Sequence, residues 1–121
     1  MEKLKKAALD TIEENKELIA SVADQIWEYA ELSLQEVRSA ALYCKMLKEL
    51  GFAVEEGVCS ISTAFVASYG SGRPIIGILA EYDALSGLSQ LGGSIKKQEL
   101  TPGGTGHGCG HNLLGAGALA A

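Results

Sequence analysis

Apolar side chains recur every three or four residues along the first fifty positions, and this stretch contains neither glycine nor proline. In an α-helix, that spacing gathers the apolar side chains on one face. The clearest repeat is Leu18, Val22, Ile26 and Ala30. Charged residues such as Glu13 and Glu17 fall outside this stripe. The pattern therefore predicts an amphipathic helix that packs on a sheet or on another helix.

A second helix is predicted from Ser33 onwards. Ser33 and Glu36 have the spacing of a capping box, in which each side chain bonds a free backbone N–H at the start of a helix. Gly51 follows at the other end as a stop signal. The predicted buried stripe of this helix is Val37, Ala41, Cys44 and Leu47. Cys44 is accordingly expected to be a core thiol.

Three later segments are predicted to be strands, at residues 52–58, 63–69 and 74–82. The tight connection Gly70-Ser71-Gly72-Arg73 predicts that the last two pair as an antiparallel hairpin. Residues 75–80 are all apolar or glycine, which is typical of a central strand covered on both faces. The predicted fold class is α/β, with N-terminal helices followed by a mixed, mostly central-parallel sheet.

Two acidic residues stand where this apolar run ends. Glu81 and Asp83 follow the predicted central strand, and in open α/β sheets ligands bind beyond the carboxyl ends of such strands. A carboxylate there can bind a metal ion or accept a hydrogen bond from a ligating imidazole. The alternative is that each acid caps a turn or a helix. The loop that follows, residues 87–106, is long and without periodicity, which favours a functional or mobile segment.

Both histidines of the chain lie in the glycine-rich segment 103–112, together with one cysteine. If this segment is extended, His107, Cys109 and His111 fall on one face, and thiolate with imidazole is a donor set that suits zinc. Residues four apart on an extended chain are about 13 Å apart, so one ion cannot hold both histidines. Cys109 and His111 are the realistic pair. The alternative is a glycine-rich loop with incidental histidines and a buried thiol.

Composition narrows the possible functions. The formal net charge of −5 gives no electrostatic basis for binding nucleic acid. No apolar run is long enough for a membrane span, and the charged start does not resemble a signal peptide. Three widely spaced cysteines predict reduced thiols and a cytoplasmic location.

Two noncatalytic interpretations remain open. A glycine-rich run before a helix can bind a phosphate, although residues 103–112 lack the lysine of a nucleotide-binding loop. Alternatively, residues 113–121 are small and apolar and stop without a cap, which predicts an assembly module whose covering layer lies elsewhere.

Two motifs, taken together, resemble a known family. Glu81-Tyr82-Asp83-Ala84-Leu85-Ser86-Gly87-Leu88 stands at the predicted strand end, and Gly106-His107-Gly108-Cys109-Gly110-His111-Asn112 follows after the long loop. In this order they resemble the N-terminal part of the dinuclear metallopeptidase and amidohydrolase family, which includes aminoacylases, hippurate hydrolases and glutamate carboxypeptidases. Weaker matches in the first helices extend the resemblance over nearly the whole chain.

The resemblance implies two divalent ions, zinc or manganese, in an intact site. Cys109 and His111 match metal ligands of the family's cysteine-containing branch. Asp83 matches an aspartate that steadies a histidine ligand in other branches, so we expect it to take part in catalysis. Glu81 stands where those branches have that histidine, and His107 matches a histidine that is not a ligand. The resemblance leaves open whether Glu81, His107 and Asn112 bind the metal or contact the residues that bind it.

The resemblance also implies an α/β catalytic domain of the phosphorylase/hydrolase-like sandwich type. Residues 1–121 would be its N-terminal part, without the lid domain that usually mediates dimerisation. The family's general-base glutamate would lie downstream of Ala121, so the chain alone is expected to be inactive. The intact enzyme would use a metal-activated water to hydrolyse the amide bond of an N-acyl or aminobenzoyl amino acid, a small-molecule substrate. It is expected to form homo- or hetero-oligomers.

Overall fold

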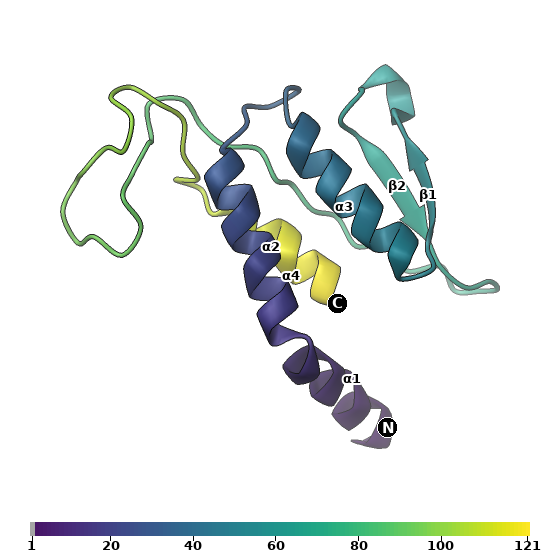
Figure 1. Ribbon diagram of the computed structural model, residues 1–121. Helices are drawn as coiled ribbons and strands as arrows, with labels where there is room; N and C mark the ends of the chain where they lie inside the picture. The colour runs from purple at the N-terminus through teal and green to yellow at the C-terminus, as the bar shows by residue number, and fades with distance from the viewer. Residues whose placement is uncertain (1) are drawn as a thin grey trace.

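The computed structural model describes residues 2–121 (Figure 1). Within these residues the regular structure consists of α-helices, one short 3-10 helix and two β-strands. In chain order they are α1 (Glu2–Glu14), α2 (Lys16–Tyr29), α3 (Val37–Glu49), β1 (Ala53–Glu56), η1 (Val58–Ser60), β2 (Phe65–Ser68) and α4 (His111–Ala120). Between β2 and α4 the described chain is irregular, apart from isolated β-bridges.

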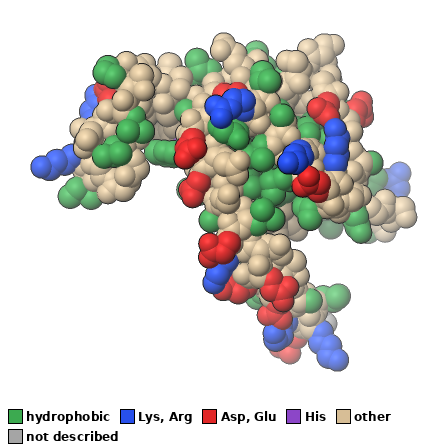
Figure 2. All heavy atoms as spheres, viewed as in Figure 1, with side chains coloured by type: hydrophobic (Ala, Val, Ile, Leu, Met, Phe, Trp, Pro, Cys, Tyr) green, Lys and Arg blue, Asp and Glu red, His purple; other side chains and the backbone are tan. Residues whose placement is uncertain are grey.

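The core lies where α2, α3 and α4 meet. Its buried members are Val22, Ala23, Ile26, Tyr43, Met46 and Ala116. Figure 1 shows α2 and α4 side by side, although most of the sequence separates them. By contrast, α1 has no buried residue and projects away from the core, and Figure 2 shows acidic and basic side chains interspersed along it. The positions of α2 and α4 matter most for the candidate site, because α4 begins at His111.

The predicted amphipathic helix is confirmed in α2. Val22 and Ile26 are buried, as the apolar spacing predicts. At the two ends of the stripe the outcome differs, because Leu18 is 48% exposed and Ala30 lies just beyond the helix. Ala30 has a left-handed backbone with φ of 42°, and its N–H bonds the carbonyl of Ile26. This residue ends the helix, since a left-handed residue cannot continue it.

The predicted start of the second helix is wrong. The helix α3 begins at Val37, because Leu34 has a left-handed φ of 65° and interrupts any helix from Ser33. The cap comes instead from Glu31, whose carboxylate accepts hydrogen bonds from the backbone N–H of Arg38 and of Ser39, both at 2.9 Å. The Ser39 hydroxyl donates to the same carboxylate. Glu31 therefore satisfies free N–H groups of the first turn and places negative charge at the positive end of the helix.

The buried stripe of α3 is only partly as predicted. Cys44 is buried, and burial raises the pKa of its thiol, whereas Val37 is 66% exposed and Ala41 is exposed. The side chains that are buried are Ser39, Ala40, Tyr43, Cys44 and Met46. This face packs against α2 on one side and against the β1–β2 hairpin on the other. These two contacts together determine which residues of α3 are buried, so a single apolar repeat does not predict them.

The predicted sheet is also wrong. The sheet is a two-stranded antiparallel hairpin of β1 and β2, in which Ala53 faces Ser68 and Glu56 faces Phe65. No parallel pair of named strands exists within residues 2–121, so a mixed, central-parallel sheet is not supported. The chain remains mixed in content, with helices and a small sheet. Residues 63–69 do supply a strand, but it pairs with the segment before it rather than with residues 74–82.

The apolar run at residues 75–80 forms no strand. Ile75 is 77% exposed, Ile76 83% and Leu79 95%. A central strand needs neighbours on both sides to bond its N–H and C=O groups and layers on both faces to bury its side chains. Residues 2–121 provide neither for this run, which explains why the apolar pattern does not predict its structure here.

The small, apolar residues near the C-terminus form helix α4, in which Gly115 and Ala116 are buried. A Cβ at Gly115 would overlap the hydroxyl of Tyr43, so the small residue makes room for the Tyr43 side chain against α4. None of the helices in residues 2–121 combines the length and the apolar character needed to cross a bilayer.

Candidate metal centre

Two backbone bridges hold the segment that carries the predicted acids. On one side, Ala84 pairs with Leu32, and the Ala84 N–H donates to the carbonyl of Glu31 at 2.7 Å. On the other side, Leu85 and Gly106 exchange two N–H···O bonds, each of 2.9 Å. Because Asp83 precedes the first pair and His107 follows the second, these bridges bring the acidic segment alongside the glycine-rich segment.

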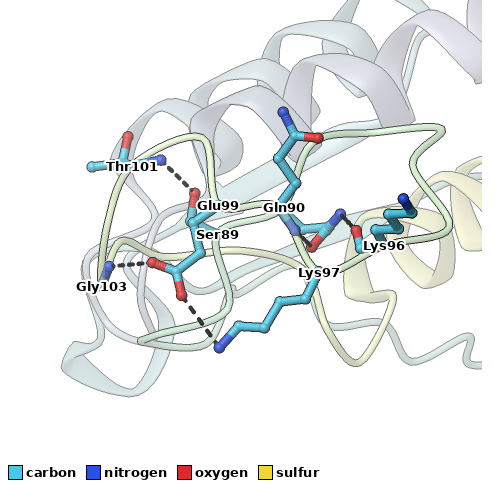
Figure 3. Close-up of polar contacts among 8 residues, drawn as sticks. Ser89, Gln90, Lys96, Lys97, Glu99, Thr101 and Gly103 are labelled. Carbon is cyan, nitrogen blue, oxygen red and sulfur yellow. Dashed lines mark hydrogen bonds and ion pairs between the residues drawn. The ribbon is translucent and has the colours of Figure 1, made fainter.

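The long loop between these segments is closed by a narrow neck. Ser89 is buried, and its N–H donates to the carbonyl of Gly104 at 3.0 Å. Its hydroxyl oxygen accepts the N–H of Thr101, also at 3.0 Å (Figure 3). A Cβ at Gly106 would overlap the carbonyl oxygen of Leu88, so this position requires glycine. The neck is thus a close backbone contact directly beside the candidate site.

Side chains also order the outer part of this loop. Gln90 accepts the N–H of Gln98 and donates to the carbonyl of Lys96, both at 3.0 Å. Glu99 accepts the N–H of Gly103 at 3.0 Å and pairs with Lys97 at 3.4 Å (Figure 3). The Gly103 hydrogen bond, followed by the Lys97 contact, lowers the pKa of Glu99. A segment without sequence periodicity therefore has a defined path.

His111 lies between the two predicted acids. Its Nδ1 is 2.8 Å from Oδ1 of Asp83, and its Nε2 is 3.2 Å from Oε2 of Glu81. One atom of each residue lies within 4.8 Å of the others, which makes the trio a candidate metal-binding group. The side chains of His111 and Asp83 are about four-fifths buried, whereas that of Glu81 is 66% exposed. The site is therefore open to solvent on the Glu81 side.

The chemistry of this donor set fits a divalent metal ion. In metal sites one imidazole nitrogen binds the ion while the other donates to a carboxylate, and Asp83 is placed to accept from Nδ1. The remaining nitrogen faces Glu81. Two ligands that each lie about 2.1 Å from one ion are roughly 3.0–3.4 Å apart, and the 3.2 Å between Nε2 and Glu81 is within that range. A protonated imidazole paired with both carboxylates would produce the same contacts.

Cys109 is not part of this group. Among the described residues, the cluster of close metal-binding atoms contains Glu81, Asp83 and His111, and Cys109 is exposed outside it. The chain turns at this point, because the Gly110 N–H donates to the carbonyl of His107 at 3.2 Å. The segment is therefore not extended, and the predicted placement of three donors on one face does not occur. The role of Cys109 as a ligand remains a prediction.

His107 and Asn112 are buried instead of facing the acids, each with 5% of its surface exposed. His107 Nε2 lies 2.9 Å from the carbonyl oxygen of Ile26, and Asn112 Nδ2 donates to the carbonyl of Ala23 at 3.3 Å. A carbonyl only accepts hydrogen bonds, so Nε2 of His107 must carry the proton. Burial, the largest cause, lowers the pKa of His107.

Two curated proteins are similar to nearly the whole chain. One is a subunit of the p-aminobenzoyl-glutamate hydrolase of Escherichia coli K12, which is 47% identical over 112 residues, or 93% of this chain and 23% of that protein. The other is the thermostable carboxypeptidase 1 of Saccharolobus solfataricus, which is 32% identical over 114 residues, or 93% of this chain and 27% of that protein. The resemblance predicted from the two sequence motifs is confirmed by these two hydrolases. No family model matches the chain.

The extent of the similarity limits what it implies. The chain spans about a quarter of the length of the two relatives it matches. Both relatives have the names of hydrolases, which supports a hydrolase-related sequence for this stretch.

Sequence reasoning missed the groups that hold the site together. Ser89, Gly106 and the carbonyls of Ala23 and Ile26 all form hydrogen bonds in or beside the segments that carry Asp83 and His111. Gly106 had a signal in the sequence, because it is the first residue of the motif that contains both histidines. The two carbonyls had none, since a backbone acceptor is the same group at every position in the sequence.

Proposed function

We propose that this chain carries part of the active site of a metal-dependent amidohydrolase. The observation that carries the proposal is His111, whose two ring nitrogens face Asp83 and Glu81. The sequence similarity to two hydrolases over 93% of the chain supports the same class of activity. Residues 1–121 would then belong to one catalytic domain.

The proposed roles of His111 and Glu81 follow from their contact, and both would hold a divalent ion. The thiolate of Cys109, which lies outside this group in the structure, would join them on the basis of the family resemblance, and a thiolate favours zinc over manganese. An intact site of two ions would need further ligands. When bound, such an ion polarises the amide carbonyl and lowers the pKa of water.

Asp83 has a separate task in this proposal. By accepting the hydrogen of His111 Nδ1 at 2.8 Å, its carboxylate fixes the tautomer in which Nε2 is free to bind metal. It also holds the plane of the ring while Glu81, on the exposed side, remains able to move. All three side chains are occupied by these tasks, so the group that transfers the proton during hydrolysis would be a further residue.

The proposed substrate is the amide of an N-acyl or aminobenzoyl amino acid, on the basis of the name of the Escherichia coli relative. That relative is named as one subunit of its enzyme, which supports an oligomeric protein here. A cytoplasmic location is supported by the cysteines, none of which forms a disulfide within residues 2–121.

The test is the metal content of the intact protein and of single variants, measured by elemental analysis after dialysis. We expect His111→Ala and Cys109→Ala each to lower both metal content and amide hydrolysis. Cys59→Ala is the matched control, because Cys59 is also an exposed free thiol but lies outside the site. Wild-type stoichiometry in both His111→Ala and Cys109→Ala would contradict the proposal.

A further inference from the structure

Two buried polar side chains stand on either side of the candidate ligands. His107 and Asn112 enclose the short segment 108–111, which contains Cys109 and His111. Polar side chains this deeply buried are costly unless hydrogen bonds compensate for the lost water. Their partners therefore indicate what the two residues do.

Both side chains bond the same helix. The acceptor for His107 is the carbonyl of Ile26, and the acceptor for Asn112 is the carbonyl of Ala23. Residues three apart in a helix are neighbours on one face, so the two acceptors form one short row along α2. Each end of the segment is thus attached to a fixed backbone rather than to a mobile side chain.

The segment between these attachments has little rigidity of its own. It contains Gly108 and Gly110, and Gly110 has a left-handed φ of 75°. Glycine allows many backbone conformations, so a glycine-rich segment needs external contacts to hold a side chain in one place. The Trp27 ring, whose centroid is 6.2 Å from that of His107, further encloses that anchor.

We propose that His107 and Asn112 are positioning residues, which fasten the segment 108–111 to α2 and thereby hold the His111 ring against Asp83. The inference deepens the proposed metal site and, for its metal-binding part, rests on it. Asn112 directly follows His111, so a shift of the Asn112 anchor moves the imidazole by a similar amount. Supporting groups of this kind commonly change metal affinity about 10- to 100-fold when they are removed.

The experiment compares variants that remove or keep the anchoring donors. His107→Leu and Asn112→Leu remove the N–H donors but keep apolar volume, whereas His107→Gln keeps a donor near the place of Nε2. In the intact protein, we expect the zinc dissociation constant to rise about 10- to 100-fold in both leucine variants and much less in His107→Gln. Thr63→Val is the control, because it removes only the buried hydrogen bond from the Thr63 hydroxyl to Glu36 and keeps the Thr63 carbonyl that accepts from Tyr82.

The same variants separate a positioning role from a general effect on stability. Thr63→Val is expected to lower thermal stability while leaving the zinc dissociation constant within twofold of the wild type. If both leucine variants also bind zinc within twofold of the wild type, the positioning role is overturned. The role is likewise overturned if His107→Gln loses as much affinity as His107→Leu.

A metal-free measurement tests the anchors independently of the proposed function. In chelator, nitrogen NMR of the histidine rings should find His107 with its proton on Nε2, and should find altered His111 ring shifts in Asn112→Leu. A proton on Nδ1 of His107, or unchanged His111 shifts in both leucine variants, would overturn the inference. A wild-type protein that binds no zinc but has the expected ring shifts would instead refute only the proposed function.

Discussion

Gly106 determines how closely the two site-bearing segments approach each other. It pairs with Leu85, and a side chain at this position would collide with the carbonyl of Leu88, which is backbone and cannot rotate away. We predict that Gly106→Ala lowers the free energy of unfolding by about 1–3 kcal/mol, the usual range for overpacking. Urea unfolding measures this change.

Gly117→Ala is the matched control for that substitution. Gly117 lies in α4, and a Cβ there would meet no atom within 4 Å apart from its chain neighbours and the helix's own backbone. Alanine at this helical position should raise stability by about 0.5–1 kcal/mol. Equal effects of the two substitutions would contradict a close contact at Gly106.

Tyr43 makes stability depend on alkaline pH. Its hydroxyl is buried without a hydrogen-bond partner among residues 2–121, and burial raises its pKa to about 12. Between its ordinary pKa of about 10 and this value, the unfolded chain loses the proton first, so stability falls as pH rises. Tyr43→Phe should therefore lose less stability over this range than the wild type.

Chemical unfolding at several pH values from neutral to about 12 measures this slope. Tyr69→Phe serves as the control, because Tyr69 is 73% exposed. At neutral pH, Tyr43→Phe should be at least as stable as the wild type, since no hydrogen bond is lost. An alkaline slope equal to that of the wild type would show that Tyr43 does not contribute.

At the residue scale, the sequence identified side chains better than their surroundings. The carboxylates of Glu81 and Asp83 and the imidazole of His111 were singled out by position and motif, and the structure brings them together. Cys109 was singled out because it alternates with glycines between the two histidines, and placing it on their face assumed an extended chain. The turn at residues 107–110 breaks that assumption, because alternating sides of a strand exist only while the backbone stays extended.

At the element scale, the start of α3 depends on a residue outside the helix. Glu31 accepts two backbone N–H groups of the first turn. We predict that Glu31→Ala lowers the free energy of unfolding by about 0.5–2 kcal/mol, as the loss of other helix caps does. Glu28→Ala is the control, because Glu28 is an exposed acid of α2. Similar losses in both variants, measured by urea unfolding, would argue against the cap.

The helices were predictable because their period depends on local geometry and on one buried face. The exact cap was not, because Glu31 reaches α3 across a left-handed turn at Leu34 that no short motif encodes. Strand pairing was less predictable still. The predicted strand at residues 63–69 could pair with residues 52–58 or with residues 74–82, and the glycine-rich turn favoured residues 74–82. In the structure β2 pairs with β1 instead, and the connection between them contains η1 (Val58–Ser60).

At the scale of the whole molecule, the apolar pattern and the observed burial disagree most at residues 75–80. Ile76 and Leu79 are more than four-fifths exposed, although the run has the composition of a central strand. Such a run forms a strand only when other strands supply hydrogen-bond partners. In contrast, α2 and α4 contribute to one buried core, and carbonyls of α2 accept hydrogen bonds from both His107 and Asn112.

The central claim, that His111 with its neighbouring acids holds a divalent ion, is tested most directly by X-ray absorption at the zinc edge of the intact protein. The account predicts imidazole nitrogen and carboxylate oxygen at about 2.0–2.2 Å, together with sulfur at about 2.3 Å. His111→Ala should reduce the imidazole signal, and Cys109→Ala should remove the sulfur. A zinc environment that is unchanged by His111→Ala would contradict the account.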